Sequence, residues 1–268
     1  SLNSRLRRKV QVVYNGVDLK DYDPSLVPSG TLRTDFGIDD DVTIVGFTGH
    51  LQPRKGIDVM IRAAKRVLAD HERVAFVVVG DNQVGAPVDY RSQYEAMARE
   101  AGISDRFIFA GFREDVRSAV LDFDIHCMPS YQEAFGRSLI EAMALGRSVV
   151  ASHVGGIPEV VRDGIDGYLV PPGDPEALCE ALVKLIDDRP LREKMGAAGL
   201  ERVHEQFDVI SLTQKIEDAT LRAIPDAAKQ VSAVLDLREN VDSVGDGKQV
   251  PVHAGADQPY DIRRAAGA

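Results

Sequence analysis

Residues 42–68 read VTIVGFTGHLQPRKGIDVMIRAAKRVL and contain a strand pattern, a loop and a helix pattern in succession. The first seven residues, 42–48, are mostly β-branched or apolar, which is typical of a strand buried on both faces. A polar loop with two glycines follows. Beyond it, apolar residues recur with the 3.6-residue spacing of a helix; they are Ile57, Met60, Ile61, Ala64, Val67 and Leu68. The stretch therefore predicts a strand–loop–helix unit.

The same alternation continues over most of the chain. Five further strands are predicted, at residues 10–14, 74–79, 107–109, 125–128 and 148–151. A helix is predicted from Asp174-Pro175 to about residue 187, because aspartate is a good N-cap and proline suits the first helical position. Two more helices are predicted at about 190–206 and 209–223. This pattern predicts an α/β fold with a doubly wound parallel sheet, a Rossmann-like domain with C-terminal helices.

We divide the chain into three parts, of which residues 10–224 form the predicted domain. Residues 1–9 carry four basic residues and no acid, and we interpret them as a basic linker remnant. Peripheral contact with anionic lipid headgroups is the alternative for this segment. Residues 225–268 lack a sustained apolar period, which predicts a mostly disordered tail with room for a short helix at about 226–237.

The composition limits the classes of function. The chain has 268 residues, 44% of them hydrophobic, so it can bury a large core. The formal net charge of -10 argues against a general nucleic-acid-binding protein, which would carry a basic surface. Cys127 and Cys179 lie in apolar stretches and suggest buried thiols in a reducing compartment. No apolar run has the length of a membrane span, so we expect a soluble cytoplasmic protein without a transmembrane segment.

Ligands of open α/β sheets bind beyond the carboxyl ends of the strands, so the loops at that edge are candidate functional segments. In the loop of residues 49–56, Gly49 and His50 are followed by the cations Arg54 and Lys55 and then by Gly56. Cations directly before a helix N-terminus are unfavourable for the helix, so a bound anion such as a diphosphate would explain them. A solvent-facing basic loop is the alternative interpretation.

The loop of residues 129–136 is the most informative, because it leads into a helix that we expect to start at Gly136–Ser138. The first-turn N–H groups of such a helix can bind a phosphate oxygen. Glu133 precedes the helix and Glu141 lies in its second turn, so the two carboxylates can contact opposite ends of an elongated ligand with paired hydroxyls. The alternative is that the acids are there only to favour the helix N-terminus.

Two further loops, residues 79–82 and 154–159, carry glycines, but each can equally be a plain connector. Together the four loops indicate a phosphorylated ligand with hydroxyl groups, which is a nucleotide sugar or a nucleotide cofactor. The sequence contains neither the Gly-x-Gly-x-x-Gly pattern of dinucleotide sites nor a P-loop, so those two kinds of site are not supported.

Several motifs occur in the order of a known family. They are residues 13–18 (VYNGVD), the loop Pro53-Arg54-Lys55-Gly56, Glu133 and Glu141 with seven residues between them, and residues 146–150, 155–159 and 166–170. Over about residues 10–224 the chain resembles the C-terminal, donor-binding domain of glycosyltransferase family 4, which has the GT-B fold. The paired glutamates with Phe135-Gly136 are the specific part of this resemblance.

By this resemblance, Lys55 would hold the diphosphate of a nucleotide-sugar donor, Glu141 the ribose hydroxyls and Glu133 the transferring sugar. The donor-binding residues that it implies are Gly49, His50, Arg54, Lys55, Phe112, Arg113, Glu133, Phe135, Gly136, Arg137, Ser138 and Glu141. Of these, Glu133, Lys55 and Arg54 would serve catalysis, with no metal and no resident cofactor. The chain departs from many family members at His50, where they have arginine, and Arg54 would compensate.

The resemblance implies a retaining hexosyltransferase, with a UDP-sugar favoured over a GDP- or ADP-sugar as donor. Family members begin with an additional acceptor-binding domain, so we expect either a separate acceptor-domain polypeptide as partner or a truncated gene. A non-catalytic nucleotide-sugar-binding or interaction subunit is the alternative function. A GT-B-like epimerase or phosphorylase module is a third, which the Glu133/Glu141 spacing disfavours.

Overall fold

The computed structural model describes residues 12–85 and 87–223, which contain one six-stranded sheet. The strands are β1 (Thr43–Thr48), β2 (Val74–Val79), β3 (Phe107–Gly111), β4 (Ile125–Met128), β5 (Ser148–Ser152) and β6 (Gly167–Val170). The helices are α2 (Thr31–Phe36), η1 (Pro53–Lys55, a 3-10 turn), α3 (Ile57–Asp70), α4 (Tyr90–Glu100), α5 (Val116–Leu121), α6 (Arg137–Ala144), α7 (Ile157–Val160), α8 (Pro175–Asp187), α9 (Arg189–Gln206) and α10 (Val209–Ala223). The predicted basic segment 1–9, the tail from 225 and the helix at 226–237 lie outside the described residues.

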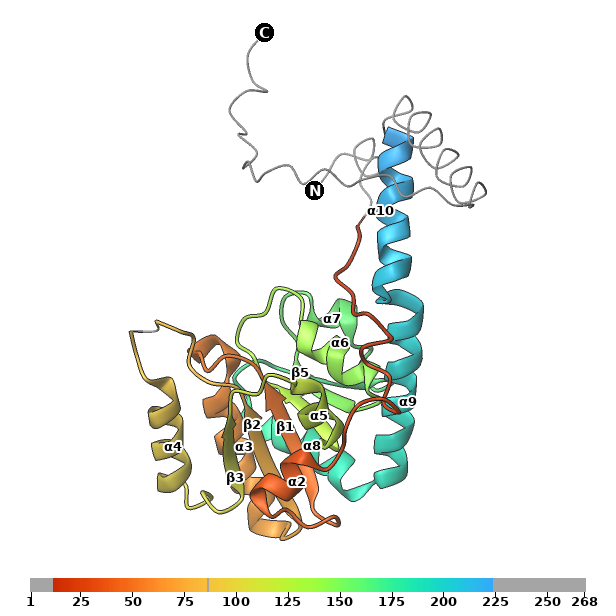
Figure 1. Cartoon of the computed structure of the whole chain (residues 1–268). Helices are drawn as coiled ribbons and strands as arrows, with labels where there is room; N and C mark the ends of the chain where they lie inside the picture. The colour runs from red at the N-terminus through yellow and green to blue at the C-terminus, as the bar shows by residue number, and fades with distance from the viewer. Residues whose placement is uncertain (1–11, 86, 224–268) are drawn as a thin grey trace, which may run out of the picture. The chain divides into compact units, whose positions relative to one another are not determined.

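Every strand pair in the sheet is parallel, and the strand order is β3-β2-β1-β4-β5-β6. The chain winds outward from β1 in one direction and from β4 in the other, so the boundary between β1 and β4 is the topological switch point. Helices cover both faces of the sheet (Figure 1). The predicted α/β fold with a doubly wound, parallel, Rossmann-like sheet is confirmed.

The strand predictions differ from the structure at two places. Residues 12–16, the described part of the predicted strand 10–14 and its continuation, form no strand, and Val17 makes only an isolated bridge with Asp208. A β-branched run favours an extended backbone but does not supply a neighbouring strand. Conversely, β6 was not predicted, because this short strand begins with Gly167 and glycine is depleted in strands.

Two apolar cores lie on the two faces of the sheet. Along β2, Val74, Phe76 and Val78 belong to the core shared with α3, α4 and α8, whereas Val77 and Val79 belong to the core shared with α2, α5, α6 and α7. This alternation follows the two-residue period of a strand, and burial on both faces explains why the strands are apolar nearly throughout. The expectation of a buried thiol is confirmed for Cys127, which lies in the first core, and is wrong for Cys179 on α8, which is only half-buried.

The helices differ in how their N-termini are capped. Aspartate side chains accept a backbone hydrogen bond at the starts of α4, α5, α8 and α9. By contrast, α3 and α6, which follow the central strands β1 and β4, begin at Gly56 and Gly136 without a side-chain cap. Both glycines have positive φ (70° and 95°), a conformation that favours glycine over other residues. The first-turn N–H groups of these two helices are therefore not used by a capping side chain.

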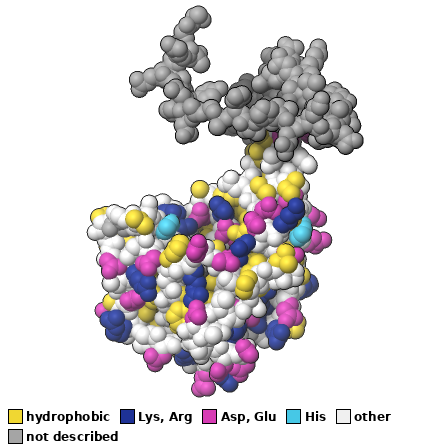
Figure 2. Space-filling model, in the orientation of Figure 1, with side chains coloured by type: hydrophobic (Ala, Val, Ile, Leu, Met, Phe, Trp, Pro, Cys, Tyr) yellow, Lys and Arg dark blue, Asp and Glu magenta, His cyan; other side chains and the backbone are white. Residues whose placement is uncertain are grey.

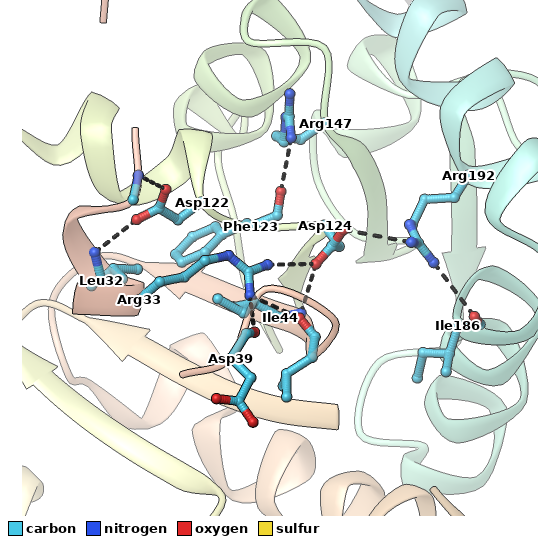
Figure 3. Close-up of polar contacts among 12 residues, drawn as sticks. Leu32, Arg33, Asp39, Ile44, Asp122, Phe123, Asp124, Arg147, Ile186 and Arg192 are labelled. Atoms are coloured by element: carbon cyan, nitrogen blue, oxygen red, sulfur yellow. Dashed lines mark hydrogen bonds and ion pairs between the residues drawn. The ribbon is translucent and has the colours of Figure 1, made fainter. Parts of the chain in front are cut away.

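A polar network lies at the amino edge of the sheet (Figure 3). Asp124 accepts a hydrogen bond from the backbone N–H of Ile44 at 2.8 Å and lies 3.4 Å from Arg33 and 3.5 Å from Arg192. Both arginines also donate to backbone carbonyls. Asp122 accepts hydrogen bonds from two backbone N–H groups at the start of α2. These contacts tie α2 and α9 to the central strands.

Acidic and basic side chains are interspersed over the face of the molecule that Figure 2 displays. Among the described residues, no helix is both long and apolar enough to cross a membrane. The chain divides into two compact units, with the sheet and the helices up to Glu217 in the first. Of the second unit, only Asp218–Ala223, the last turns of α10, is described, and it holds an ion pair between Arg222 and Asp218 at 4.0 Å.

Candidate functional site

The loops that follow β2, β1 and β4 touch one another at the carboxyl edge of the sheet. A Cβ atom added at Gly80 would lie 2.0 Å from the carbonyl oxygen of Gly49, and one added at Gly56 would lie 2.0 Å from that of Pro129. The backbone N–H of Tyr131 donates to the carbonyl of Arg54 at 2.8 Å. Glycine is required where backbones approach this closely, so these residues bring the predicted loops together.

The loop that follows β5 packs against the same assembly. A Cβ atom added at Gly155, whose φ is +54°, would lie 1.7 Å from the carbonyl oxygen of Glu133. The backbone N–H of Gly156 donates to the carbonyl of Ala134 at 3.1 Å. The turn at 155–156 therefore supports the backbone of the loop that carries Glu133.

An ion pair lies where these loops meet. Lys55 Nζ is 2.5 Å from Glu133 Oε2, and the two side chains are only 14% and 12% exposed. Arg54, more exposed at 46%, lies 4.0 Å from the same oxygen. Its Nε donates to the side chain of Gln52 at 2.9 Å. The three residues predicted to serve catalysis, Lys55, Arg54 and Glu133, are thus neighbours.

Two opposing effects set the pKa of Glu133. Burial raises it, but the hydrogen bond and charge of Lys55, a backbone hydrogen bond from Phe135 and the charge of Arg54 together hold it below its usual value. Hydrogen bonds to a charged carboxylate favour the ionised form. Glu133 is therefore a carboxylate at neutral pH because of its cationic neighbours.

The start of α6 lies directly after this ion pair in the chain. Gly136 adopts a left-handed conformation, and Arg137 and Ser138 form the first turn. The Ser138 hydroxyl lies 3.4 Å from the sulfur of Met128, while the Arg137 side chain is 72% exposed. Uncapped N–H groups and the helix dipole make this terminus suitable for a phosphate oxygen.

Glu141 lies one turn further along α6 and contacts Arg137 and Tyr22, two residues that line a cavity of about 730 Å³. Its carboxylate pairs with Arg137 Nε at 3.0 Å and is 13% exposed. Burial raises its pKa, while Arg137 and a hydrogen bond from Tyr22 lower it, and the net shift is upward. Burial and the charge of Glu141 also raise the pKa of Tyr22. Tyr22 was not predicted from the sequence, because nothing in its surroundings marks it.

The side chains of the other predicted site residues differ in what they contact. Phe135 stacks on Tyr14, with ring centroids 5.5 Å apart, so its ring packs into the molecule. Phe112 is 76% exposed after β3. Arg113 turns to α2, where it pairs with Asp35 at 2.7 Å, and the structure does not bring it to the Lys55–Glu133 pair. His50 is solvent-exposed at the end of β1, beside Gly49.

Several buried polar groups lie at or near the carboxyl edge without a hydrogen-bond partner among the described residues. They are the hydroxyls of Thr48, Ser130 and Ser152, and both ring nitrogens of His126 in β4. Burial, followed by the charge of Lys55, lowers the pKa of His126 to about 3, so its ring is neutral. In the described part of the chain, no group of three or more His, Cys, Asp or Glu side chains is placed to hold a metal ion.

Comparison with known proteins gives a consistent result. A family model described as glycosyl transferases group 1 matches residues 29–202. The D-inositol 3-phosphate glycosyltransferase of Kribbella flavida is 34% identical over 199 residues, which cover 72% of this chain and 46% of that protein. An uncharacterized glycosyltransferase of Methanocaldococcus jannaschii is 29% identical over 203 residues, covering 74% and 50%. The chain thus spans about half the length of the curated relatives it matches.

Solved structures agree in fold. The Anabaena protein HepE, in complex with UDP and glucose, superposes with a TM-score of 0.72 and 30% identity, over 80% of this chain and 57% of that one. The C-terminal domain of the group 1 glycosyl transferase LpcC from Francisella tularensis has a TM-score of 0.63 and 28% identity, over 72% of this chain and all (100%) of that one. The second match covers a single domain.

Proposed function

The chain belongs to the glycosyl transferases group 1 family, and on this basis we propose that it is the donor-binding part of a retaining hexosyltransferase of glycosyltransferase family 4. The observation that carries the proposal is the Lys55–Glu133 pair beside the uncapped start of α6. It combines cations and N–H groups suited to a diphosphate with a carboxylate suited to sugar hydroxyls.

In the proposed arrangement the diphosphate contacts Lys55, Arg54 and the first turn of α6, and Glu141 accepts from the ribose hydroxyls. Glu133 contacts the transferring hexose. Negative charge develops on the diphosphate as the bond to the sugar breaks, and preorganised cations and N–H groups at that position stabilise it. These groups belong to the chain itself, so the proposal includes metal-independent chemistry and no resident cofactor.

We further propose a UDP-sugar as donor, ahead of a GDP- or ADP-sugar. The support comes from HepE, which has been solved with UDP and with UDP-glucose. The acceptor stays open in this proposal. The relatives are about twice as long as the matched segment, so we propose that acceptor contacts come from a region outside residues 29–202, whether in the same polypeptide or in a separate acceptor-domain partner.

The test is calorimetric titration of the chain with UDP and with UDP-glucose. Loss of one charge-assisted contact costs about 1.5–3 kcal/mol, so Lys55→Ala should weaken UDP binding about 10- to 100-fold. Lys65→Ala, which removes an exposed lysine on the adjacent helix α3, is the matched control and should leave the affinity unchanged. No UDP binding by the wild-type chain, or equal affinities for wild type and Lys55→Ala, would reject the proposed site.

A further inference from the structure

The charges around Glu133 do not balance among the chain's own groups. Lys55 lies 2.5 Å and Arg54 4.0 Å from one oxygen of the Glu133 carboxylate, while the other oxygen accepts the backbone N–H of Ala134 at 3.1 Å. Two cations thus face one carboxylate, leaving one positive charge in excess. Lys55 and Glu133 are 14% and 12% exposed, so water screens this charge only partly.

The backbone holds these groups in place. Tyr131 donates its N–H to the carbonyl of Arg54, and the 155–156 turn packs against the carbonyl of Glu133. The pair cannot separate widely without disturbing both close approaches. An anion that approaches Lys55 therefore also approaches Glu133. The repulsion between the anion and the Glu133 carboxylate is not relieved by a movement of the two loops apart.

A diphosphate diester, the central group of a nucleotide sugar, carries two negative charges. Counting the side-chain charges of Lys55, Arg54 and an ionised Glu133, it would leave one negative charge in excess next to a carboxylate that is only 12% exposed. One proton restores balance. Uncompensated charge is costly where water is excluded, and a carboxyl group in that position is neutralised rather than left charged.

On these grounds we propose that donor binding transfers one proton from solvent to Glu133, which then faces the donor as a neutral carboxylic acid. The buffer acid in the solvent loses the proton, a carboxylate oxygen of Glu133 gains it, and no other covalent bond forms or breaks. In this state Glu133 donates one hydrogen bond to the nucleotide sugar and can still accept one from a sugar hydroxyl, whereas the ionised carboxylate can only accept. This inference rests on the proposed function and assigns a protonation state to the same site.

The opposing effects on the pKa of Glu133 favour proton uptake, rather than release, when the donor binds. Burial is the largest influence on its pKa and raises it, and the cations and backbone hydrogen bonds outweigh that effect. When a diphosphate takes over the same cations, burial and the new negative charge both favour the protonated form.

The other titratable groups near Glu133 are few. The loop before α3 brings Lys55, Arg54 and the exposed His50, and the 155–156 turn brings only backbone. His126, on β4 near Lys55, stays neutral because burial lowers its pKa. The His50→Gln variant therefore separates proton uptake at Glu133 from any uptake at the histidine of the same loop.

The experiment is calorimetric titration with UDP-glucose in buffers of different ionisation enthalpy, between about pH 5.5 and 7.5. UDP-glucose is the probe because its diphosphate is a diester without a group that titrates there, unlike the terminal phosphate of UDP. The variation of binding enthalpy with buffer gives the number of protons taken up. We expect uptake approaching one proton for wild type and His50→Gln, and none for Glu133→Gln.

Affinity gives a second readout. Uptake of one proton makes the dissociation constant of the wild-type chain rise up to about tenfold per pH unit, whereas that of Glu133→Gln should be independent of pH. Binding without proton uptake overturns the inference alone, as does uptake that persists in Glu133→Gln and disappears in His50→Gln. If the wild-type chain does not bind UDP-glucose at all, the proposed uridine-donor function fails, and this inference with it.

Discussion

Acidic and basic side chains pair at both edges of the sheet, but their other contacts differ. At the amino edge, Asp124 accepts a backbone N–H and faces two arginines that also donate to backbone carbonyls (Figure 3). At the carboxyl edge, Lys55 and Glu133 bind each other, with Arg54 near by. The amino-edge contacts connect elements of the fold, while the carboxyl-edge contacts connect side chains on loops.

The two edges also differ in the number of buried polar groups that have no hydrogen-bond partner. Three hydroxyls at the carboxyl edge, those of Thr48, Ser130 and Ser152, are buried without a hydrogen-bond partner in the described part of the chain, against one in the amino-edge network, that of Thr31. The helices that start there from β1 and β4 have glycine instead of a capping side chain. Buried polar groups are normally satisfied, so a concentration of exceptions marks a functional edge. Stability and ligand binding should therefore respond to different substitutions.

The largest effect is expected at the amino edge. Asp124→Ala removes the acceptor of one backbone N–H and the anion between two arginines, so it should lower the free energy of unfolding by about 2–4 kcal/mol. Urea denaturation measures this. Glu193→Ala is the matched control, because its pair with Arg189 is exposed (63% and 77%) and should contribute less than about 1 kcal/mol.

The contrast between the two edges would be wrong if Asp124→Ala lowered both the free energy of unfolding and the affinity for UDP. Folded Asp124→Ala protein, titrated with UDP under conditions where it is fully native, should keep the affinity of the wild-type chain. A tenfold loss would mean that the amino edge is coupled to the proposed donor site.

The second effect is expected at the carboxyl edge and concerns a glycine. Gly155→Ala places a methyl group 1.7 Å from the carbonyl of Glu133 at a positive φ, so the Glu133 loop must shift. We expect a loss of about 1–2 kcal/mol in stability from the strain and about tenfold in UDP affinity from the displaced loop. Gly164→Ala is the control, since Gly164 also has positive φ (72°) but no neighbour within 4 Å of the added atom. Equal UDP affinities for the two variants would show that the loop does not need the glycine.

Much of this fold follows from apolar periodicity. Runs such as 74–79 and 125–128 are recognisable because parallel strands buried on both faces are apolar nearly throughout, and α8 is recognisable from its Asp174-Pro175 start. The strand expected at 10–14 and the missed β6 show the limit of this signal. Strand pairing depends on which neighbour the fold brings near, and a short run carries no information about that.

For the candidate site, the sequence gives the loops but not the contacts between them. That Lys55 and Glu133 pair at 2.5 Å depends on glycine-mediated approaches between loops 78 residues apart in sequence, which no spacing rule contains. Tyr22 has no motif and reaches Glu141 only through the fold. Arg113, grouped with the site by resemblance, pairs with Asp35 on α2 at 2.7 Å, a contact that no motif in the sequence indicates.

The smallest effect sharpens the contrast within the carboxyl edge itself, between Glu133 and Glu141. The folded-state pKa of Glu133 is lowered, so just below its unfolded value the unfolded chain binds more protons, and Glu133 contributes stability that is present at neutral pH and lost on acidification. The folded-state pKa of Glu141 is raised, so its protonated form is favoured in the fold and stability falls as pH rises through that pKa. Urea denaturation of Glu133→Gln and Glu141→Gln from about pH 3.5 to 7 should give differences from wild type of about 1 kcal/mol or less that run in opposite directions with pH. If the two differences changed in the same direction with pH, burial, rather than the pairing with Lys55, would decide the protonation of Glu133 in the protein alone.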